Sequence, residues 1–194
     1  NHYSLESSPK SNFISRPSSL VSHPLVTAIV STYNSERFIR DCLEDLEDQT
    51  IAGRLEIIVV NSGSQQNEEA IVKGFQEKHA NIKYIKTEQR ETLYQAWNRG
   101  IKMASGKYIA NANTDDRHRK DALEILSRTL DNDSSASLVY GDCLITENEN
   151  ETFEQNTANR CYIFPEFSRR QMLARQFFGP QPMWRKSVHD KIGY

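Results

Sequence analysis

The chain has 194 residues, which is enough for one sizeable hydrophobic core. Its 24 lysines and arginines nearly balance its 26 aspartates and glutamates, so the formal net charge is −2. This balance argues against a nucleic-acid partner bound through bulk positive charge. No apolar run approaches the roughly 18 residues that a membrane-spanning helix needs. The three cysteines (Cys42, Cys143 and Cys161) fit neither a zinc cluster nor a disulfide framework, so we expect a reducing, cytoplasmic setting.

The composition divides the chain into three parts. Residues 1–24 hold eight serines and three prolines with little apolar periodicity, as in a linker or a loosely held arm. Residues 25–142 alternate regularly between strand-like and helix-like segments, whereas residues 143–194 are more polar and less periodic. The sequence pattern of this third part continues up to Tyr194, so we expect the third part to be incomplete.

Strands and helices are expected to alternate through the regular part. Apolar runs of strand length lie at 25–30, 55–60, 82–85, from 108 onwards and at 137–141. Amphipathic helices are expected at about 36–49, 67–79, 93–104 and 122–130. The helix at 93–104 has Thr92 as its N-cap and an inner face that includes Leu93 and Trp97. This alternation predicts an α/β fold, with a mostly parallel sheet covered by helices on both faces.

Beyond residue 142 the sequence patterns that indicate strands and helices become weaker. The polar stretch 146–159 is expected to be a hairpin tip or a mobile loop, and 160–167 is a candidate strand. An amphipathic helix is a candidate at 168–178, followed by a proline-interrupted segment and a short helix near 186–191. This part therefore adds few firm elements to the predicted sheet.

Three polar loops follow predicted strands, at 31–34, 61–64 and 113–116. Right-handed crossovers place the carboxyl ends of parallel strands at one edge of the sheet, so these loops should lie together. Open α/β sheets bind their ligands at this edge. The sequence therefore predicts a ligand site where the three loops meet.

Asp115 and Asp116 are adjacent carboxylates at the end of the strand that begins at Tyr108. Neighbouring carboxylates repel each other, and a hard divalent cation that prefers oxygen ligands would compensate them. The alternative is a solvated turn before a helix, where aspartate suits the positive end of the helix dipole. The place of the pair at the ligand edge favours the cation.

Several common sites are absent from the sequence. The first strand is not followed by the glycine fingerprint of dinucleotide-binding folds, and no Gly-x-x-x-x-Gly-Lys phosphate loop occurs. There is no Gly-x-Ser-x-Gly elbow, and the five histidines show no metal-ligand spacing. A receiver-type phosphorylation domain would carry its acidic pair after the first strand, whereas this pair follows the fourth.

An ordered series of motifs remains. It consists of Ser31-Thr32-Tyr33-Asn34, Glu56-Ile-Ile-Val-Val-Asn-Ser-Gly-Ser64, Ala96-Trp97-Asn98-Arg99-Gly100-Ile101, Ala104-Ser105-Gly106-Lys107-Tyr108-Ile109 and Asn113-Thr114-Asp115-Asp116. This series resembles the family 2 glycosyltransferases of the GT-A fold. The resemblance implies a nucleotide-sugar-binding half at 25–142 and a partial acceptor-side region at 143–194, where the match is looser.

The resemblance also implies roles for individual residues. Ser31 and Tyr33 would contact the nucleotide base, the tyrosine through its aromatic face. Asn61 and Ser62 would hold the base or the ribose, although the family usually has aspartate in one or both positions. Arg90 is a candidate for the base or the diphosphate.

A metal motif is implied at the end of the fourth strand. Asp115 stands at the closing position of an Asp-x-Asp pattern, Asn113 replaces the opening aspartate, and Thr114 is assigned to the nucleotide. Asp115 and Asp116 keep two carboxylates, enough for Mn²⁺ or Mg²⁺ shared with the donor diphosphate. Arg185 is considered as a group that faces the diphosphate or the acceptor.

The implied activity is that of an inverting hexosyltransferase. A sugar passes from a nucleotide-diphosphate donor, with UDP favoured, to a hydroxyl group of a glycan or glycoconjugate acceptor. No catalytic base is assigned, because the family's carboxylate usually follows the region where this chain stops, and Glu166 and Asp190 match no such motif. The missing base, Asn113 and the neutral pair Asn61-Ser62 keep an alternative open, a non-catalytic nucleotide-binding or scaffolding module. No nucleic-acid partner is expected, while peripheral membrane association and the oligomeric state are left open.

Overall fold

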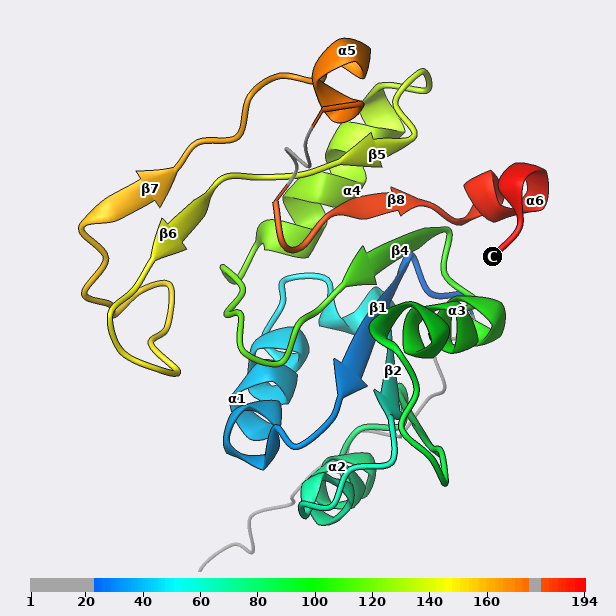
Figure 1. Cartoon of the computed structure of the whole chain (residues 1–194), viewed down its shortest axis with the longest axis vertical. Helices are drawn as coiled ribbons and strands as arrows, with labels where there is room; N and C mark the ends of the chain where they lie inside the picture. Colours follow the sequence, from blue (N-terminus) through cyan, green and yellow to red (C-terminus); the bar gives the residue numbers. More distant parts are fainter. Residues whose placement is uncertain (1–22, 175–178) are drawn as a thin grey trace, which may run out of the picture.

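The computed structural model describes residues 23–174 and 179–194. Its centre is a six-stranded sheet in the order β3-β2-β1-β4-β8-β5 (Figure 1). The strands are β1 (Val26–Thr32), β2 (Leu55–Asn61), β3 (Ile82–Lys86), β4 (Tyr108–Asn111), β5 (Leu138–Val139) and β8 (Met183–Arg185). The first four run parallel, and β8 lies antiparallel between β4 and β5. The mostly parallel sheet expected from the sequence is therefore confirmed.

Helices cover both faces of this sheet. The main ones are α1 (Glu36–Glu47), α2 (Glu68–Gln76), α3 (Leu93–Met103) and α4 (Ala122–Asn132). Helices α1, α2 and α4 share one core with Val26, Ala28 and Val30 of β1. On the opposite face α3 packs in a second core around Ile29. Strand β1 is thus buried on both sides, which explains its continuous apolar run.

A capping box determines where α3 begins, and a glycine allows it to pack closely on the sheet. Thr92 and Gln95 form a capping box, in which Thr92 Oγ1 accepts from the Gln95 backbone N–H and the Gln95 side chain accepts from the Thr92 N–H. Within the helix, a Cβ atom on Gly100 would lie only 2.8 Å from the Ile29 side chain. The absence of a side chain at this position therefore lets α3 approach β1 closely.

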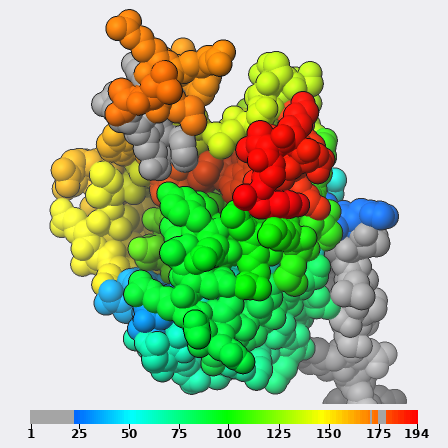
Figure 2. All heavy atoms as spheres, turned by 45° about the vertical axis from the view of Figure 1, so that its right-hand side comes forward, coloured from blue at the N-terminus to red at the C-terminus, as the bar shows by residue number. Residues whose placement is uncertain are grey.

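The region after residue 142 forms a separate hairpin and short helical turns. Strands β6 (Cys143–Ile145) and β7 (Arg160–Tyr162) pair antiparallel outside the main sheet, so 146–159 is a hairpin tip, one of the two alternatives expected. The short helices are η1 (Ala52–Arg54), α5 (Arg169–Met172), η2 (Lys186–Val188) and α6 (His189–Ile192). Figure 2 shows α5, in orange, projecting from one end of the molecule. The remainder of the helix expected at 168–178, from 175 onwards, and the arm at 1–22 lie outside the described residues.

The structure differs from the expected elements in three places. The strand expected at 137–141 is only two residues long and lies at the sheet edge, paired with β8. Strand β8 itself was not expected, because three residues beside two prolines show no periodicity. Leu93, expected on the inner face of α3, is 49% exposed, whereas Trp97 packs against the core as expected. Among the described residues, no helix has the length and apolarity needed to cross a bilayer.

Candidate functional site

The loops that follow β1 and β2 are joined by hydrogen bonds at the carboxyl edge of the sheet. The Ser62 backbone N–H donates to the Thr32 carbonyl at 2.9 Å, and the Asn34 N–H donates to Ser64 Oγ at 3.0 Å. Asn34 adopts a left-handed φ of 52°, a conformation that asparagine tolerates better than most residues. These two loops therefore converge as the sequence predicted.

The loop after β3 brings Arg90 onto the ring of Tyr33. The Arg90 guanidinium carbon lies 4.1 Å from the ring centroid, in cation–π geometry. Gly63 makes this approach possible: its φ is +66°, and a Cβ atom there would lie 2.9 Å from the Gln89 carbonyl carbon. Ser31, two residues before Tyr33, is half-buried. Tyr33 and Arg90, assigned separately from the sequence, thus form one structural unit.

Asn61 and Ser62 are buried, and their side chains bind other parts of the protein. Asn61 Nδ2 donates to the Tyr84 hydroxyl at 3.0 Å, and its Oδ1 accepts from the Ser64 N–H at 2.8 Å. Ser62 Oγ donates to the Glu91 carbonyl at 3.0 Å and accepts from the Glu91 N–H. These bonds tie the loop after β2 to β3 and to the start of α3. They shape the edge on which Tyr33 and Arg90 lie.

The acidic pair stands at the end of β4, on the other side of β1. Thr114 is buried, Asp115 is exposed and Asp116 is half-buried. Asp116 Oδ2 accepts a hydrogen bond from Asn113 Nδ2 at 2.7 Å. Burial raises the pKa of Asp116, the bond from Asn113 opposes this shift, and the charge of Asp115 adds to it. The pair is therefore a concentration of negative charge at the rim of the site.

The basic residues that follow this pair do not neutralise it. Their ion pairs are Arg117 with Asp45 at 2.6 Å, Arg119 with Asp121, and Lys120 with Asp48 at 2.9 Å. In the described part of the chain, Asp115 and Asp116 take part in no ion pair. The charge of the two carboxylates is thus left for a partner from outside the chain.

Hydrogen bonds join helix α1 and the hairpin of β6 and β7 to the acidic loop that follows β4. Cys42 Sγ donates to the Asn113 carbonyl at 3.7 Å, and burial raises the pKa of the Cys42 thiol, so it stays protonated. Arg117 also donates to the Asn150 carbonyl at 2.8 Å, while Asn150 Nδ2 donates to the Arg37 carbonyl at 3.0 Å. The tip of the hairpin therefore docks beside the acidic loop. No local pattern in the sequence indicates this contact between distant segments.

The acidic pair suits a hard divalent cation only if other ligands complete its coordination. Among residues 23–174 and 179–194 there is no group of three or more His, Cys, Asp or Glu side chains that could hold a metal ion. Asp115 and Asp116 supply carboxylate oxygens, the type of ligand that Mg²⁺ and Mn²⁺ prefer. The pair therefore fits a cation that also binds water or the oxygens of an anionic ligand.

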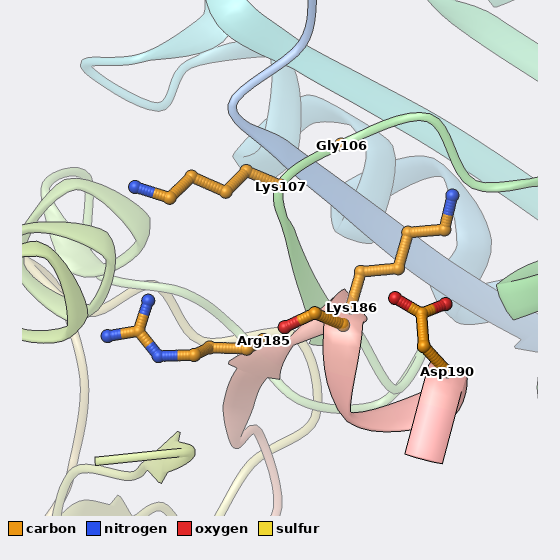
Figure 3. A pocket seen from close by; sticks show the side chains of 6 residues that line it. Gly106, Lys107, Arg185, Lys186 and Asp190 are labelled. Carbon is orange, nitrogen blue, oxygen red and sulfur yellow. The ribbon is translucent and has the colours of Figure 1, made fainter. Parts of the chain in front are cut away.

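A cavity lies at the opposite edge of the sheet. Its volume is about 280 Å³, and it is lined by Gly106, Lys107, Arg185, Lys186, Ser187 and Asp190 (Figure 3). Lys107 precedes β4, and Lys186 follows the antiparallel β8, so this cavity faces away from the acidic pair. Asp190 is therefore in the wrong place to act as a base at the predicted site.

Arg185 does not face the predicted ligand edge. Its guanidinium donates to the carbonyls of Ala136 at 2.8 Å and Asp133 at 3.0 Å, and also to the Leu130 carbonyl. These carbonyls belong to the C-terminal end of α4 and the turn after it, so Arg185 caps that helix. The interpretation of Arg185 as a diphosphate or acceptor group was wrong. The cause is the unexpected antiparallel β8, which carries Arg185 to the far edge.

Comparisons of sequence relate the chain to known glycosyltransferases. The profile of the family described as "Glycosyl transferase family 2" matches residues 27–193. An uncharacterised glycosyltransferase of Methanocaldococcus jannaschii is 26% identical over 172 residues, which cover 88% of this chain and 59% of that protein. A chondroitin synthase of Escherichia coli is 28% identical over 151 residues, 78% of this chain and 21% of the synthase. The chain thus spans less than two thirds of the length of each of these relatives.

Solved structures share the fold. A mannosyltransferase from Pyrobaculum calidifontis, in complex with GDP-Man and Mn²⁺, superimposes with a TM-score of 0.65 at 18% identity, over 90% of this chain and 48% of that one. TarS of S. aureus in complex with UDP gives a TM-score of 0.66 at 19% identity, over 86% of this chain and 48% of that one. The architecture described above is accordingly the GT-A fold.

Proposed function

The chain belongs to glycosyl transferase family 2, and on this premise we propose that it binds a nucleotide-diphosphate sugar for transfer to an acceptor hydroxyl. The donor is a UDP-sugar, and the acceptor is a glycan or glycoconjugate. The transfer is a single displacement with inversion, assisted by Mn²⁺ or Mg²⁺. A cytoplasmic location and a role in polysaccharide synthesis are part of this proposal, and the chondroitin synthase among the relatives supports the second of them.

One observation carries this proposal. At a single edge of the sheet, the loop after β1 carries an aromatic ring with an arginine on its face, and the loop after the neighbouring strand β4 carries two carboxylates that have no ion pair among the described residues. A nucleotide offers a base for the ring, and its diphosphate repels the carboxylates unless a divalent cation lies between them. A nucleoside diphosphate with its cation satisfies both features at once.

The residues of the chain then take distinct roles. Tyr33 stacks on the base, a contact that contributes about 1–3 kcal/mol in nucleic-acid complexes. The base takes the place of Arg90 on the face of the Tyr33 ring. The Arg90 guanidinium then binds the phosphates, since guanidinium groups bind phosphate in bidentate fashion. Asp115 binds the cation, and Asp116 adds negative charge beside it. When bound, the cation stabilises the charge that develops on the leaving diphosphate.

The alternative function is a non-catalytic nucleotide-binding or scaffolding module. It is favoured by Asn113, which replaces an aspartate, and by Asn61, whose side chain is committed to Tyr84. No base is assigned, since Asp190 lies at the far edge and Glu166 is exposed between β7 and α5. Release of sugar from a UDP-sugar by this chain would favour an enzyme, and binding without any turnover by a longer chain would favour the module.

A thermal-shift screen tests the donor site. UDP, GDP, CDP and dTDP are added at about a hundred times Kd, with and without Mn²⁺, which should stabilise the fold by about 2.7 kcal/mol. For a domain of this size the melting temperature rises by roughly 2–4 °C per kcal/mol. We expect the largest shift with UDP and Mn²⁺ together. If none of the four nucleotides shifts the melting temperature with Mn²⁺ present, the proposal is wrong.

A further inference from the structure

Helices α1 and α2 begin next to each other at the ligand edge, and each is capped by the other. Their own N-cap side chains, those of Ser35 and Asn67, make no capping bond. Instead Glu36, the first residue of α1, accepts from the Asn67 backbone N–H at 3.1 Å. Glu68, the first residue of α2, accepts from the Ser35 N–H at 2.8 Å. The two carboxylates thus satisfy donors that a helix N-terminus leaves unpaired.

Glu68 differs from Glu36 in being completely buried. Its relative exposure is 0%, whereas Glu36 is exposed. Lys73 and Lys86 pair with the next residue, Glu69. Glu68 itself takes part in no ion pair in the part of the chain that the structure describes. Because a buried carboxylate is unfavourable unless hydrogen bonds compensate it, stability alone gives little reason for an acidic residue at this position.

The second partner of Glu68 connects it to the residue that follows Tyr33. Ser64 Oγ donates to the Glu68 carboxylate at 2.7 Å and accepts from the Asn34 N–H at 3.0 Å. Asn34 Oδ1 is a second acceptor, at 3.1 Å, but the shorter and charge-assisted bond to Glu68 takes the single hydroxyl proton. Glu68 therefore turns the hydroxyl so that its oxygen faces the Asn34 N–H. Asn34 reverses the chain here with its left-handed φ of 52°.

We propose that Glu68 is a positioning residue for the nucleotide base, which holds the turn at Asn34, and with it the Tyr33 ring, in place before a ligand arrives. The base then stacks on a ring whose backbone is already ordered, so binding does not have to order the turn. Glu68 lies on the β2 side of β1, and its effect should be independent of a cation at the loop after β4. This inference rests on the proposed function and adds the group that prepares its base site.

Calorimetry of UDP binding to Glu68→Gln, with and without Mn²⁺, tests this inference. The amide keeps the shape of the carboxylate, but either the Ser35 N–H or the Ser64 hydroxyl then meets a donor instead of an acceptor. If the prepared turn is populated only about one tenth to one third of the time, the Kd of UDP rises about three- to tenfold. The factor by which Mn²⁺ tightens UDP binding should stay the same.

A double-mutant cycle with Tyr33→Ala separates positioning from a general loss of stability. Once the ring is absent, Glu68→Gln should weaken UDP binding no further, because it acts through that ring. Ser64→Ala removes the link from its other end, should reproduce the loss, and serves if Glu68→Gln does not fold. Glu47→Gln is the matched control, since Glu47 binds Asn81 at the opposite end of α1. It should lower the melting temperature without changing the Kd of UDP.

The outcomes separate this inference from the proposed function. Unchanged dissociation constants in both Glu68→Gln and Ser64→Ala would overturn the inference while the donor site stands. A loss that persists in full on the Tyr33→Ala background would overturn it as well. Absence of UDP binding to the natural chain, even with Mn²⁺ present, would contradict the donor site itself.

Discussion

Asp115 differs from the other acidic residues around it in lacking a protein partner. Asp45 binds Arg117, and Glu68 accepts from Ser35 and Ser64, so both are part of the framework. Asp115 contributes no such contact among the described residues. Its negative charge is therefore useful to a ligand and unfavourable to the empty fold.

Asp115→Asn should separate these two effects. We expect loss of the Mn²⁺-dependent part of UDP binding, together with an unchanged or higher melting temperature of the ligand-free chain, because the repulsion by Asp116 is relieved. Calorimetry of UDP with and without Mn²⁺ measures the first effect, and a thermal melt measures the second. Asp48→Asn, which breaks only the pair with Lys120, is the control and should leave the Mn²⁺ effect intact. A large loss of ligand-free stability in Asp115→Asn would instead identify a structural cap.

The Tyr33 ring makes a second prediction at this scale. Tyr33→Ala should weaken UDP binding by about 1–3 kcal/mol, or roughly 5- to 150-fold, through loss of base stacking. Tyr94→Ala is a matched control, since Tyr94 is 72% exposed on the first turn of α3. Equal dissociation constants for the two variants would show that the base does not stack on Tyr33.

At the scale of elements, Glu56 holds three parts of the fold together. Its buried carboxylate accepts hydrogen bonds from Thr27 of β1, Lys83 of β3 at 2.6 Å and the Ser105 N–H before β4 at 2.8 Å. Burial by itself raises the pKa of Glu56, but the bonds from Lys83, Ser105 and Thr27 outweigh it and hold the pKa below its ordinary value of 4.5. The ionised form is therefore the one that stabilises the sheet.

The sign of the pH dependence follows from this shift. Because the folded pKa is lower than the unfolded one, the contribution of Glu56 is complete above about pH 4.5 and is lost as the pH falls through the folded value. Glu56→Gln should cost about 2 kcal/mol or more at pH 7, and less as the pH falls below 4.5. Urea melts of both chains at pH 7 and pH 3.5 measure this, with the variant Glu154→Gln, at an exposed position of the hairpin tip, expected to change little. A difference that stays constant across this range would contradict the account of Glu56.

Arg185 allows a second test at this scale, of the C-terminal end of helix α4. Arg185→Met should lower the free energy of unfolding by about 1–3 kcal/mol, since the carbonyls at the end of α4 lose a charged donor. The dissociation constant of UDP should not change, because the residue lies at the far edge of the sheet. Arg170→Met, on exposed α5, is the control for stability. Weaker UDP binding with an unchanged urea midpoint would restore the role that the sequence suggested for Arg185.

The sequence predicted the first four strands and their helices because each carries a long, regular apolar pattern. It located the acidic pair and Tyr33 because both follow directly from strand ends in a parallel sheet. It could not predict that Asn61 binds Tyr84, since that contact depends on the register of β2 and β3. It also missed β8, whose three residues lie beside two prolines, and with it the true place of Arg185. Short strands and the partners of side chains depend on tertiary contacts, which a local sequence pattern cannot predict.

At the scale of the whole molecule, the order of strands decides where function lies. Strand β1 is central, so its loop meets the loop of β2 on one side and flanks the acidic loop of β4 on the other. The hairpin of β6 and β7 docks on α1 and Arg117, which places this hairpin beside the same edge (Figure 1). The cavity lined by Lys107 and Lys186 is at the opposite edge, and its cations are used to hold Asp131 and the Ala104 carbonyl.

A crystal structure of the chain with UDP and Mn²⁺ tests the central claim most directly, because the anomalous signal of manganese locates the ion independently of the nucleotide. We predict one manganese peak at coordination distance from the Asp115 carboxylate, with the diphosphate bound to the same ion and the base on the Tyr33 ring in place of Arg90. Nucleotide bound in the cavity beside Lys107 and Lys186, or manganese away from Asp115, would contradict the account.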